Sequence, residues 1–216
     1  MKKTIAVLGL GKYGISLAKS MYAMGADVLV VDNNPDKLKE MEGFCTAAVC
    51  ADLTNEDEVE LLGLKNMDIV AVAMGGNLSA SIMSVAVAKE LKVPLIVAKS
   101  SSDRMSNILK KIGANKVIVP EEYGGEQSAR ILASNTFLDY FQVDKNLCMV
   151  EMRPLPKWVG KNMIELNVRK NYRANVIAVK NNESGHWEII DPAEPLSEED
   201  ELLIVLEHKD LNRINK

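Results

Sequence analysis

The sequence has few of the residues that hold metals or form disulfides. It contains three cysteines, none of them in a CxxC pair, and two histidines. A structural zinc site needs four clustered Cys or His ligands, and a secreted disulfide framework needs an even, patterned set of cysteines. An odd, unpatterned set is typical of a reducing compartment. The composition therefore argues against a zinc protein and a disulfide-rich secreted domain, and we expect a cytoplasmic protein.

Long apolar runs and an excess of positive charge are also missing. No apolar stretch approaches the roughly 18 residues needed to cross a bilayer. The first expected strand begins directly after Met-Lys-Lys, so we expect no signal peptide. The net charge of −4 gives no broad basic surface for a nucleic acid. We therefore expect no nucleic-acid partner, and a membrane association only through another protein.

Recognisable catalytic groups are scarce as well. No Ser/His/Asp or Cys/His arrangement can be assembled, and there is no Walker lysine for P-loop ATP hydrolysis. The histidines are His186 and His208, and a single histidine in a turn is most often simply solvated. The sequence therefore predicts that the protein is not an enzyme.

The most informative segment is the N-terminal stretch of residues 4–32. Ile5 to Leu8 are apolar and partly β-branched, as in a strand buried on both faces. Gly9, Gly11 and Gly14 follow with GxGxxG spacing. In this motif the first glycine permits a tight turn, the second lets the backbone approach a phosphate, and the third lets the helix pack on the strand.

The residues after the glycines complete a nucleotide-binding fingerprint. Ile15 to Met24 is predicted to be a helix, whose free N-terminal N–H groups would point at a phosphate. A second strand ends at Asp32, about 20 residues after the glycines, where a carboxylate can accept hydrogen bonds from a ribose diol. The alternative, a turn whose glycines serve packing only, is less consistent with the complete fingerprint. We therefore predict an adenine-nucleotide site, which by itself specifies neither the nucleotide nor an enzyme.

Apolar runs alternate with helical patterns as far as about residue 120. Six strands with intervening helices predict an α/β fold with a Rossmann-like, doubly wound parallel sheet of strand order 3-2-1-4-5-6. Ligands bind such sheets beyond the carboxyl ends of the strands. The residues expected there are Gly9, Gly11, Lys12, Tyr13, Gly14, Asp32, Asn33, Asn34, Asp52, Leu53, Met74, Gly75, Asn77 and Lys99. A cation at a strand end, such as Lys99, can meet phosphate oxygens, although a solvated loop lysine is the alternative.

The chain is predicted to have three parts: residues 1–120 form the nucleotide-binding domain, residues 121–144 form crossover and dimerisation helices, and residues 145–216 form a small α+β subdomain. The small size of the last part makes pairing with a second copy plausible. Glu121 and Glu122 could bind a hard cation through carboxylate oxygens, or could be solvated acids at a helix start. A strong nucleotide site without a visible catalytic site favours a sensor, because a nucleotide shifts an equilibrium through its differential affinity for two states.

Three segments resemble the RCK family, the regulators of potassium conductance. They are the glycine-rich stretch Ile5 to Gly14, the pair Val31–Asp32 and the run Lys110 to Glu121. The last part of the chain resembles the C-terminal RCK subdomain over residues 164–169 and 175–180. The resemblance covers essentially the whole chain, and it is strong for the KtrA/TrkA-type cytoplasmic subunits of bacterial potassium uptake systems.

The resemblance implies a function and a set of ligands. It implies ATP and ADP as opposing ligands at the glycine-rich loop, with Lys12 at the terminal phosphates, Asp32 at the ribose and Lys99 at the phosphates. It also implies that Glu121 helps to bind Mg²⁺ or Ca²⁺ beside the ATP phosphates. The expected assembly is an octameric ring of dimers that gates a KtrB/TrkH-like membrane potassium channel or transporter subunit at the inner face of the membrane.

The resemblance also suggests a second ligand, and two other functions have to be compared with the one above. Related subunits bind cyclic di-AMP between two copies of the C-terminal module, and the resemblance suggests that the residues at that site here are Ile164, Arg169, Asn175, Val176, Ile177 and Pro192. An NAD(H)-dependent oxidoreductase would share the glycine-rich fingerprint but needs a catalytic group that the sequence does not offer. An NAD-responsive regulator would be expected to carry a basic DNA-binding module. We therefore expect a cytoplasmic regulatory subunit that responds to ATP and ADP, with NAD or NADH as the alternative ligand.

Overall fold

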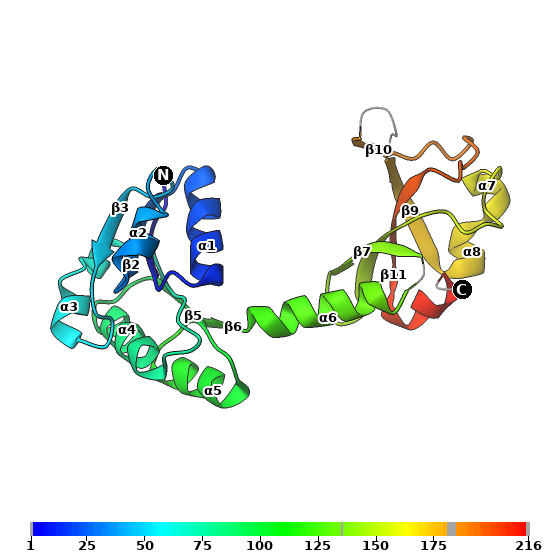
Figure 1. Ribbon diagram of the computed structural model, residues 1–216. Helices are drawn as coiled ribbons and strands as arrows, with labels where there is room; N and C mark the ends of the chain where they lie inside the picture. Colours follow the sequence, from blue (N-terminus) through cyan, green and yellow to red (C-terminus); the bar gives the residue numbers. More distant parts are fainter. Residues whose placement is uncertain (1, 135, 181–184, 215–216) are drawn as a thin grey trace. The chain divides into compact units, whose positions relative to one another are not determined.

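The computed structural model describes residues 2–134, 136–180 and 185–214. The chain divides into two compact units, Met1–Glu122 and Tyr123–Lys216 (Figure 1). In the described part of the chain, no helix combines the length and the apolar character needed to cross a membrane.

The first unit is a parallel six-stranded sheet with helices on both faces. Its strand order is β3-β2-β1-β4-β5-β6, which confirms the predicted fold class and order. The strands are β1 (Thr4–Leu8), β2 (Asp27–Asp32), β3 (Ala47–Cys50), β4 (Ile69–Val72), β5 (Leu95–Lys99) and β6 (Lys116–Ile118). The helices are α1 (Lys12–Ala23), α2 (Pro35–Lys39), α3 (Glu56–Glu60), η1 (Leu64–Asn66), α4 (Leu78–Glu90) and α5 (Asp103–Ile112).

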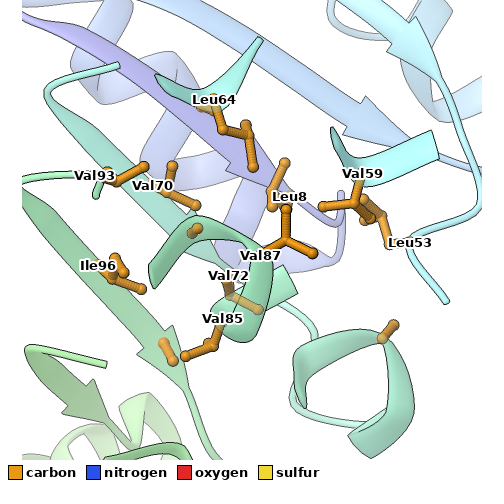
Figure 2. Close-up of a cluster of buried hydrophobic side chains, with 14 of the residues drawn as sticks. Leu8, Leu53, Val59, Leu64, Val70, Val72, Val85, Val87, Val93 and Ile96 are labelled. Carbon is orange, nitrogen blue, oxygen red and sulfur yellow. The ribbon is translucent and has the colours of Figure 1, made fainter. Parts of the chain in front are cut away.

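Alternating residues of the central strands build a core on each face of this sheet. Leu8, Val70 and Val72 pack with residues of α3, α4 and the following strands, as Figure 2 shows. Ile5 and Val7, which point to the opposite face, pack with residues of α1 and the α2 region. Each fully buried Val, Leu or Ile side chain contributes roughly 1.5–3 kcal/mol. Burial on both faces explains why these strands read as continuous apolar runs.

Local signals fix the helix boundaries. Asn34 caps α2 by accepting the backbone N–H of Asp36 at 2.9 Å. Asn77 caps α4 in the same way, and Gly113 ends α5 with a φ of +131°. The expected helix over residues 15–24 begins earlier in the structure, at Lys12, so the first turn of α1 lies within the glycine-rich motif.

The second unit is built around an antiparallel five-stranded sheet of order β10-β9-β11-β8-β7. Its strands are β7 (Phe137–Gln142), β8 (Leu147–Met152), β9 (Ala174–Lys180), β10 (Trp187–Ile189) and β11 (Glu201–Glu207). The remaining helices of the chain are α6 (Pro120–Leu132), α7 (Met163–Leu166), α8 (Val168–Tyr172) and η2 (His208–Arg213). One face of the sheet packs against Trp158, Leu166 and Ile214 to form the core.

The prediction of helices throughout residues 121–144 was wrong in its second half. Only α6 is helical, and residues 137–142 form strand β7. Phe137 and Tyr140 are both buried although they stand three residues apart, a spacing typical of a helix. The pairing with β8 shifts register between Phe137 and Asp139, and this irregularity brings both aromatic side chains to the core face.

Candidate functional site

The turn between β1 and α1 carries the three glycines. Gly9 has a φ of +96°, and a Cβ there would overlap the side chain of Met74. A Cβ on Gly14 would overlap the carbonyl oxygen of Gly9 and would lie 3.2 Å from the Cβ of Ala73. A Cβ on Gly11 would meet nothing within 4 Å. The packing of the turn therefore requires Gly9 and Gly14, whereas the backbone at Gly11 is open to an approaching group.

Helix α1 begins directly after this turn. Gly11 is its N-cap and supplies no side-chain acceptor, and its first turn contains no acidic residue. The first N–H groups of a helix have no intrahelical acceptor and carry about half a unit of positive charge. The start of α1 is therefore suited to an anion such as a phosphate.

Asp32, the last residue of β2, is held by the backbone on both sides. One carboxylate oxygen accepts the N–H of Leu10 at 2.7 Å, and the other accepts the N–H of Asn34 at 3.0 Å. The residue is only 6% exposed. The bond to Leu10 ties the acid at the end of β2 directly to the glycine-rich turn.

A pocket opens beside this acid, and we call it the Asp32 pocket. It is lined by Asp32, Asn33, Lys37, Ala51, Asp52, Leu53, Met74, Asn77 and Ala80. Its volume of about 170 Å³ is below the range of about 300–1,000 Å³ usual for sites that hold a whole small molecule. The buried alanines, Leu53 and Met74 give it apolar walls, and its other side chains are polar. Hydrogen bonds from the backbone and hydroxyl of Thr54 lower the pKa of Asp52, so this acid is ionised at neutral pH.

A second pocket lies at the start of α1, and we call it the Lys99 pocket. It is lined by Gly11, Lys12, Tyr13, Ser16, Ala73, Lys99, Pro120 and Glu121, and its volume is about 540 Å³. It combines the two lysines with the N-terminal N–H groups of α1. One wall of the pocket is therefore basic, as a site for phosphate oxygens would be.

Lys99 and Glu121 form an ion pair within the Lys99 pocket. The Nζ of Lys99 lies 2.5 Å from Oε1 of Glu121, and the hydrogen bond lowers the pKa of Glu121. The lysine side chain is 16% exposed and the glutamate side chain is 65% exposed. The acid can therefore turn to solvent more easily than the lysine can.

The pockets contain most of the residues predicted to bind a nucleotide. The four that line neither pocket are Gly9, Gly14, Asn34 and Gly75. The side chain of Asn34 caps α2. Gly75 makes room for Lys99, because a Cβ there would lie 3.1 Å from its Cε. These residues support the pockets rather than line them.

Sequence reasoning missed several lining residues. They are Ser16, Lys37, Ala51, Ala73, Ala80 and Pro120. The small ones carry no chemical signal in a sequence. Lys37 is different, because a basic residue in the helix after an acid-terminated strand could have been recognised as a partner for that acid.

Glu121, the residue predicted to bind a metal, does not belong to a cluster of three or more metal-ligating side chains in the described part of the chain. Among residues 2–134, 136–180 and 185–214, no three His, Cys, Asp or Glu side chains come together as a metal cluster. Mg²⁺ is often held by one or two carboxylates together with phosphate oxygens. Glu121 fits such a role only if a bound nucleotide supplies the other ligands.

The second unit has a basic pocket of its own, which we call the Arg169 pocket. It is lined by Arg169, Arg173, Asn175, Glu207, Lys209, Asp210 and Arg213. Lys209 pairs with Glu207 at 2.6 Å, and Arg213 pairs with Asp210 at 2.7 Å. The two acids are thus neutralised within the pocket, and the four cations leave it a net positive charge in a chain whose overall charge is −4.

The structure gathers only part of the set predicted to bind cyclic di-AMP. Arg169 and Asn175 line the Arg169 pocket, and the residues that do not are Ile164, Val176, Ile177 and Pro192. Ile164 is 69% exposed and Ile177 is 40% exposed, whereas Val176 packs against the core. The predicted set therefore does not form one pocket within a single chain.

These features define a Rossmann-type protein with a small antiparallel domain after it. Residues 5–120 match the TrkA-N domain, and residues 149–216 match the TrkA-C domain. The chain is 34% identical to the Ktr system potassium uptake protein C of Bacillus subtilis (strain 168), over 100% of this chain and 97% of that protein. It is 36% identical to the Ktr system potassium uptake protein A of the same organism, over 96% of this chain and 92% of that protein.

A solved structure described as the GsuK channel bound to NAD shares the fold, with a TM-score of 0.66 and 17% identity over 99% of this chain and 39% of that one. The chain belongs to the RCK family and is a relative of the Ktr potassium uptake proteins.

Proposed function

We propose that the chain is a cytoplasmic regulatory subunit that gates a membrane potassium transporter or channel in response to adenine nucleotides. The observation that carries the proposal is the pair of pockets at the glycine-rich turn, one containing a buried acid and the other two lysines. An adenosine phosphate has matching parts, namely a base and ribose at one end and negative charge at the other. The relationship to Ktr potassium uptake proteins supports the transport role.

The nucleoside occupies the Asp32 pocket in this proposal. Its base lies against the apolar walls formed by Ala51, Leu53 and Ala80. A ribose hydroxyl donates to Asp32, since a carboxylate has about four lone-pair positions and the two backbone N–H groups and the ammonium of Lys37 leave about one of them free. The phosphates then pass Gly11, the glycine whose Cβ position is open, and reach the start of α1.

The terminal phosphate distinguishes ATP from ADP in the Lys99 pocket. A γ-phosphate competes with Glu121 for the ammonium of Lys99, because both are anions within reach of one cation. Once Lys99 pairs with phosphate, the Glu121 carboxylate is free to bind Mg²⁺ or Ca²⁺ together with phosphate oxygens. ADP, being shorter, leaves the Lys99–Glu121 pair intact. The two nucleotides thus favour different states, which is the requirement for a ligand-driven shift.

A second ligand binds the second unit. Cyclic di-AMP carries two phosphodiesters, and the net positive Arg169 pocket is suited to one of them. The predicted residues outside this pocket include the exposed Ile164 and Ile177, which are available to a ligand held between two copies of the chain. A ligand held between two copies requires a dimer. Together with the resemblance to KtrA/TrkA-type subunits, this leads us to propose a homo-oligomer of dimers that forms an octameric ring beneath its membrane partner.

The rival is an NAD(H)-dependent oxidoreductase. GsuK, which shares the fold, has been described bound to NAD, so NAD and NADH are competing ligands for the same pockets. An oxidoreductase also needs an acid, base or hydride-orienting group beside the nicotinamide, and this role would fall to the Tyr13, lysine or carboxylate side chains of the two pockets, so a hydride-transfer assay decides between the functions.

The test is a calorimetric comparison of ATP, ADP and NADH, each with and without Mg²⁺, on the full chain. We expect ATP and ADP to compete for one site per chain, and Mg²⁺ to strengthen the binding of ATP alone. Light scattering with each nucleotide reports the size of the ring. Tighter binding of NADH together with turnover in a hydride-transfer assay would contradict the proposal.

A further inference from the structure

Lys37 lies against the acid expected to bind ribose. Its Nζ is 3.2 Å from one carboxylate oxygen of Asp32 and 3.4 Å from the other. It lines the Asp32 pocket but not the Lys99 pocket. Any effect of this cation on a ligand is therefore exerted at the nucleoside end and not at the terminal phosphates.

Three donors thus surround a nearly buried carboxylate. The N–H groups of Leu10 and Asn34 come from the backbone and fix the plane of the carboxylate of Asp32. Among the described residues, Lys37 is the one charged side chain that donates a hydrogen bond to this acid, and its own side chain is 40% exposed. Because Asp32 is nearly buried, the loss of this partner would let its carboxylate turn toward water. The ammonium therefore helps to hold the carboxylate of Asp32 in one orientation.

A second acid makes this cation more important. Asp52 lines the same pocket, so removal of Lys37 would leave two carboxylates facing one nucleoside site. Repulsion between them would favour a movement of the Asp32 side chain. Such a movement would reduce the ability of Asp32 to accept a hydrogen bond from the 2′-hydroxyl of a ribose.

We propose that Lys37 is a positioning residue that sets the selectivity of the site for ribonucleosides over 2′-deoxyribonucleosides. The proposal rests on the proposed function, because it takes an adenine nucleotide as the ligand of the Asp32 pocket. Lys37 holds the Asp32 carboxylate aligned, and Asp32 in turn accepts a hydrogen bond from the 2′-hydroxyl. A 2′-deoxynucleotide lacks this donor.

The test compares ATP with 2′-dATP, and ADP with 2′-dADP, by equilibrium binding to the full chain. We expect the wild-type protein to favour each ribonucleotide about tenfold, the effect of one hydrogen bond to a charged group. Lys37→Gln is expected to lower this preference to about threefold or less for both pairs. Lys37→Arg keeps the charge and two or more donors, and is expected to retain most of the preference.

Lys39→Gln is the matched control. Lys39 is on the same helix, its side chain is 73% exposed, and it pairs with Asp36 rather than with the pocket. It makes the same change in net charge, so it should leave the ribonucleotide preference at its wild-type value. A general charge effect would instead weaken ribo- and deoxyribonucleotides equally in both variants.

The outcomes separate this inference from the function on which it rests. A wild-type protein that binds ATP but shows the same preference after Lys37→Gln, or no preference at all, overturns the role of Lys37 and leaves the nucleotide site standing. An equal loss in Lys39→Gln also overturns it. A wild-type protein that binds none of the four nucleotides overturns the proposed function itself.

Discussion

The ammonium of Lys99 lies 2.5 Å from the carboxylate of Glu121, at the same pocket as the start of α1. The pair joins the carboxyl end of β5 to the first turn of α6. Either partner can be drawn away by an ion of opposite charge, the lysine by a phosphate and the glutamate by a divalent cation. The relationship of the two residues thus offers a physical means by which the charge of a nucleotide changes the contacts at the start of α6.

Glu121→Gln tests the proposed cation site. We expect the substitution to abolish the effect of Mg²⁺ or Ca²⁺ on ATP binding and to leave the ADP affinity nearly unchanged, because a neutral amide lacks the negative charge with which a carboxylate binds these cations. Calorimetry with and without the cation provides the measurement. Glu122→Gln is the control, since this neighbouring acid does not line the Lys99 pocket. Equal losses for ATP and ADP in Glu121→Gln would argue against a cation at this position.

Asp32→Asn tests the acid that joins the two parts of the site. The asparagine keeps one acceptor oxygen but turns an NH₂ group toward a backbone N–H of Leu10 or Asn34. An unsatisfied buried donor costs about 1–3 kcal/mol, so the free energy of unfolding should fall by that amount. Affinities for ATP and ADP should fall by a similar factor, because the ribose is common to both.

Chemical denaturation and calorimetry on the same Asp32→Asn sample separate the two effects. Unchanged affinity for both nucleotides in a folded variant would rule out a contact between Asp32 and the ribose. A loss for ATP alone would instead place this acid near the phosphates.

Two glycine substitutions distinguish packing from ligand contact. Gly14→Ala should lower the free energy of unfolding by roughly 1–3 kcal/mol or more, because the added methyl group overlaps the carbonyl oxygen of Gly9. Gly11→Ala should leave stability nearly unchanged, since its Cβ position is empty, but should weaken nucleotide binding by filling the space along the phosphates. Urea denaturation measures the free energy of unfolding of both variants, and nucleotide titration measures their affinity. If Gly11→Ala bound ATP as the wild type does, the phosphates would not pass that glycine.

Arg169→Gln tests the basic pocket of the second unit. We expect the affinity for cyclic di-AMP to fall about tenfold, the effect of losing one charge-assisted hydrogen bond. Lys170→Gln is the matched control, because it removes a neighbouring charge that does not line the pocket. Binding of ATP should be unaffected in both variants. Equal weakening by the two substitutions would indicate general charge attraction and not a defined site.

The second unit should become less stable at alkaline pH. Burial raises the pKa of Tyr140 from 10.0 to about 12. A raised pKa in the folded state means that folding favours the protonated phenol. The contribution of Tyr140 to the free energy of unfolding is therefore complete below pH 10 and is lost as the pH rises toward 12. The ultraviolet absorbance of tyrosinate and thermal melting over this range measure both effects. Tyr140→Phe should remove the part of the tyrosinate absorbance that appears at the highest pH. An unchanged titration curve would contradict the raised pKa of Tyr140.

The sequence was most informative where chemistry requires a fixed spacing. The glycines and Asp32 could be placed from the sequence because a turn, a helix start and a strand end lie at set distances along the chain. The strand order of the first unit could also be predicted, because six apolar strands that alternate with helices are typical of a doubly wound sheet. The bulge that makes Phe137 and Tyr140 share a face could not be read from spacing, because it mimics the period of a helix.

Contacts that depend on the tertiary structure were harder to predict from the sequence. The Arg169 pocket joins the start of β9 to the residues after β11, because these strands pair antiparallel and align Asn175 with Val205. Arg173, Lys209 and Arg213 have no spacing relative to one another that signals a site. The pairing of Lys99 with Glu121 likewise depends on β5 and β6 being neighbours in the sheet.

The most direct test of the account is an experimental structure of the full chain crystallised with ATP and Mg²⁺. We predict density for the ribose within hydrogen-bonding distance of Asp32, with the phosphates beside Gly11 and Lys12 and with Lys99 turned from Glu121 toward the terminal phosphate. A nucleotide bound elsewhere, or a Lys99–Glu121 pair left intact beside a bound γ-phosphate, would contradict it.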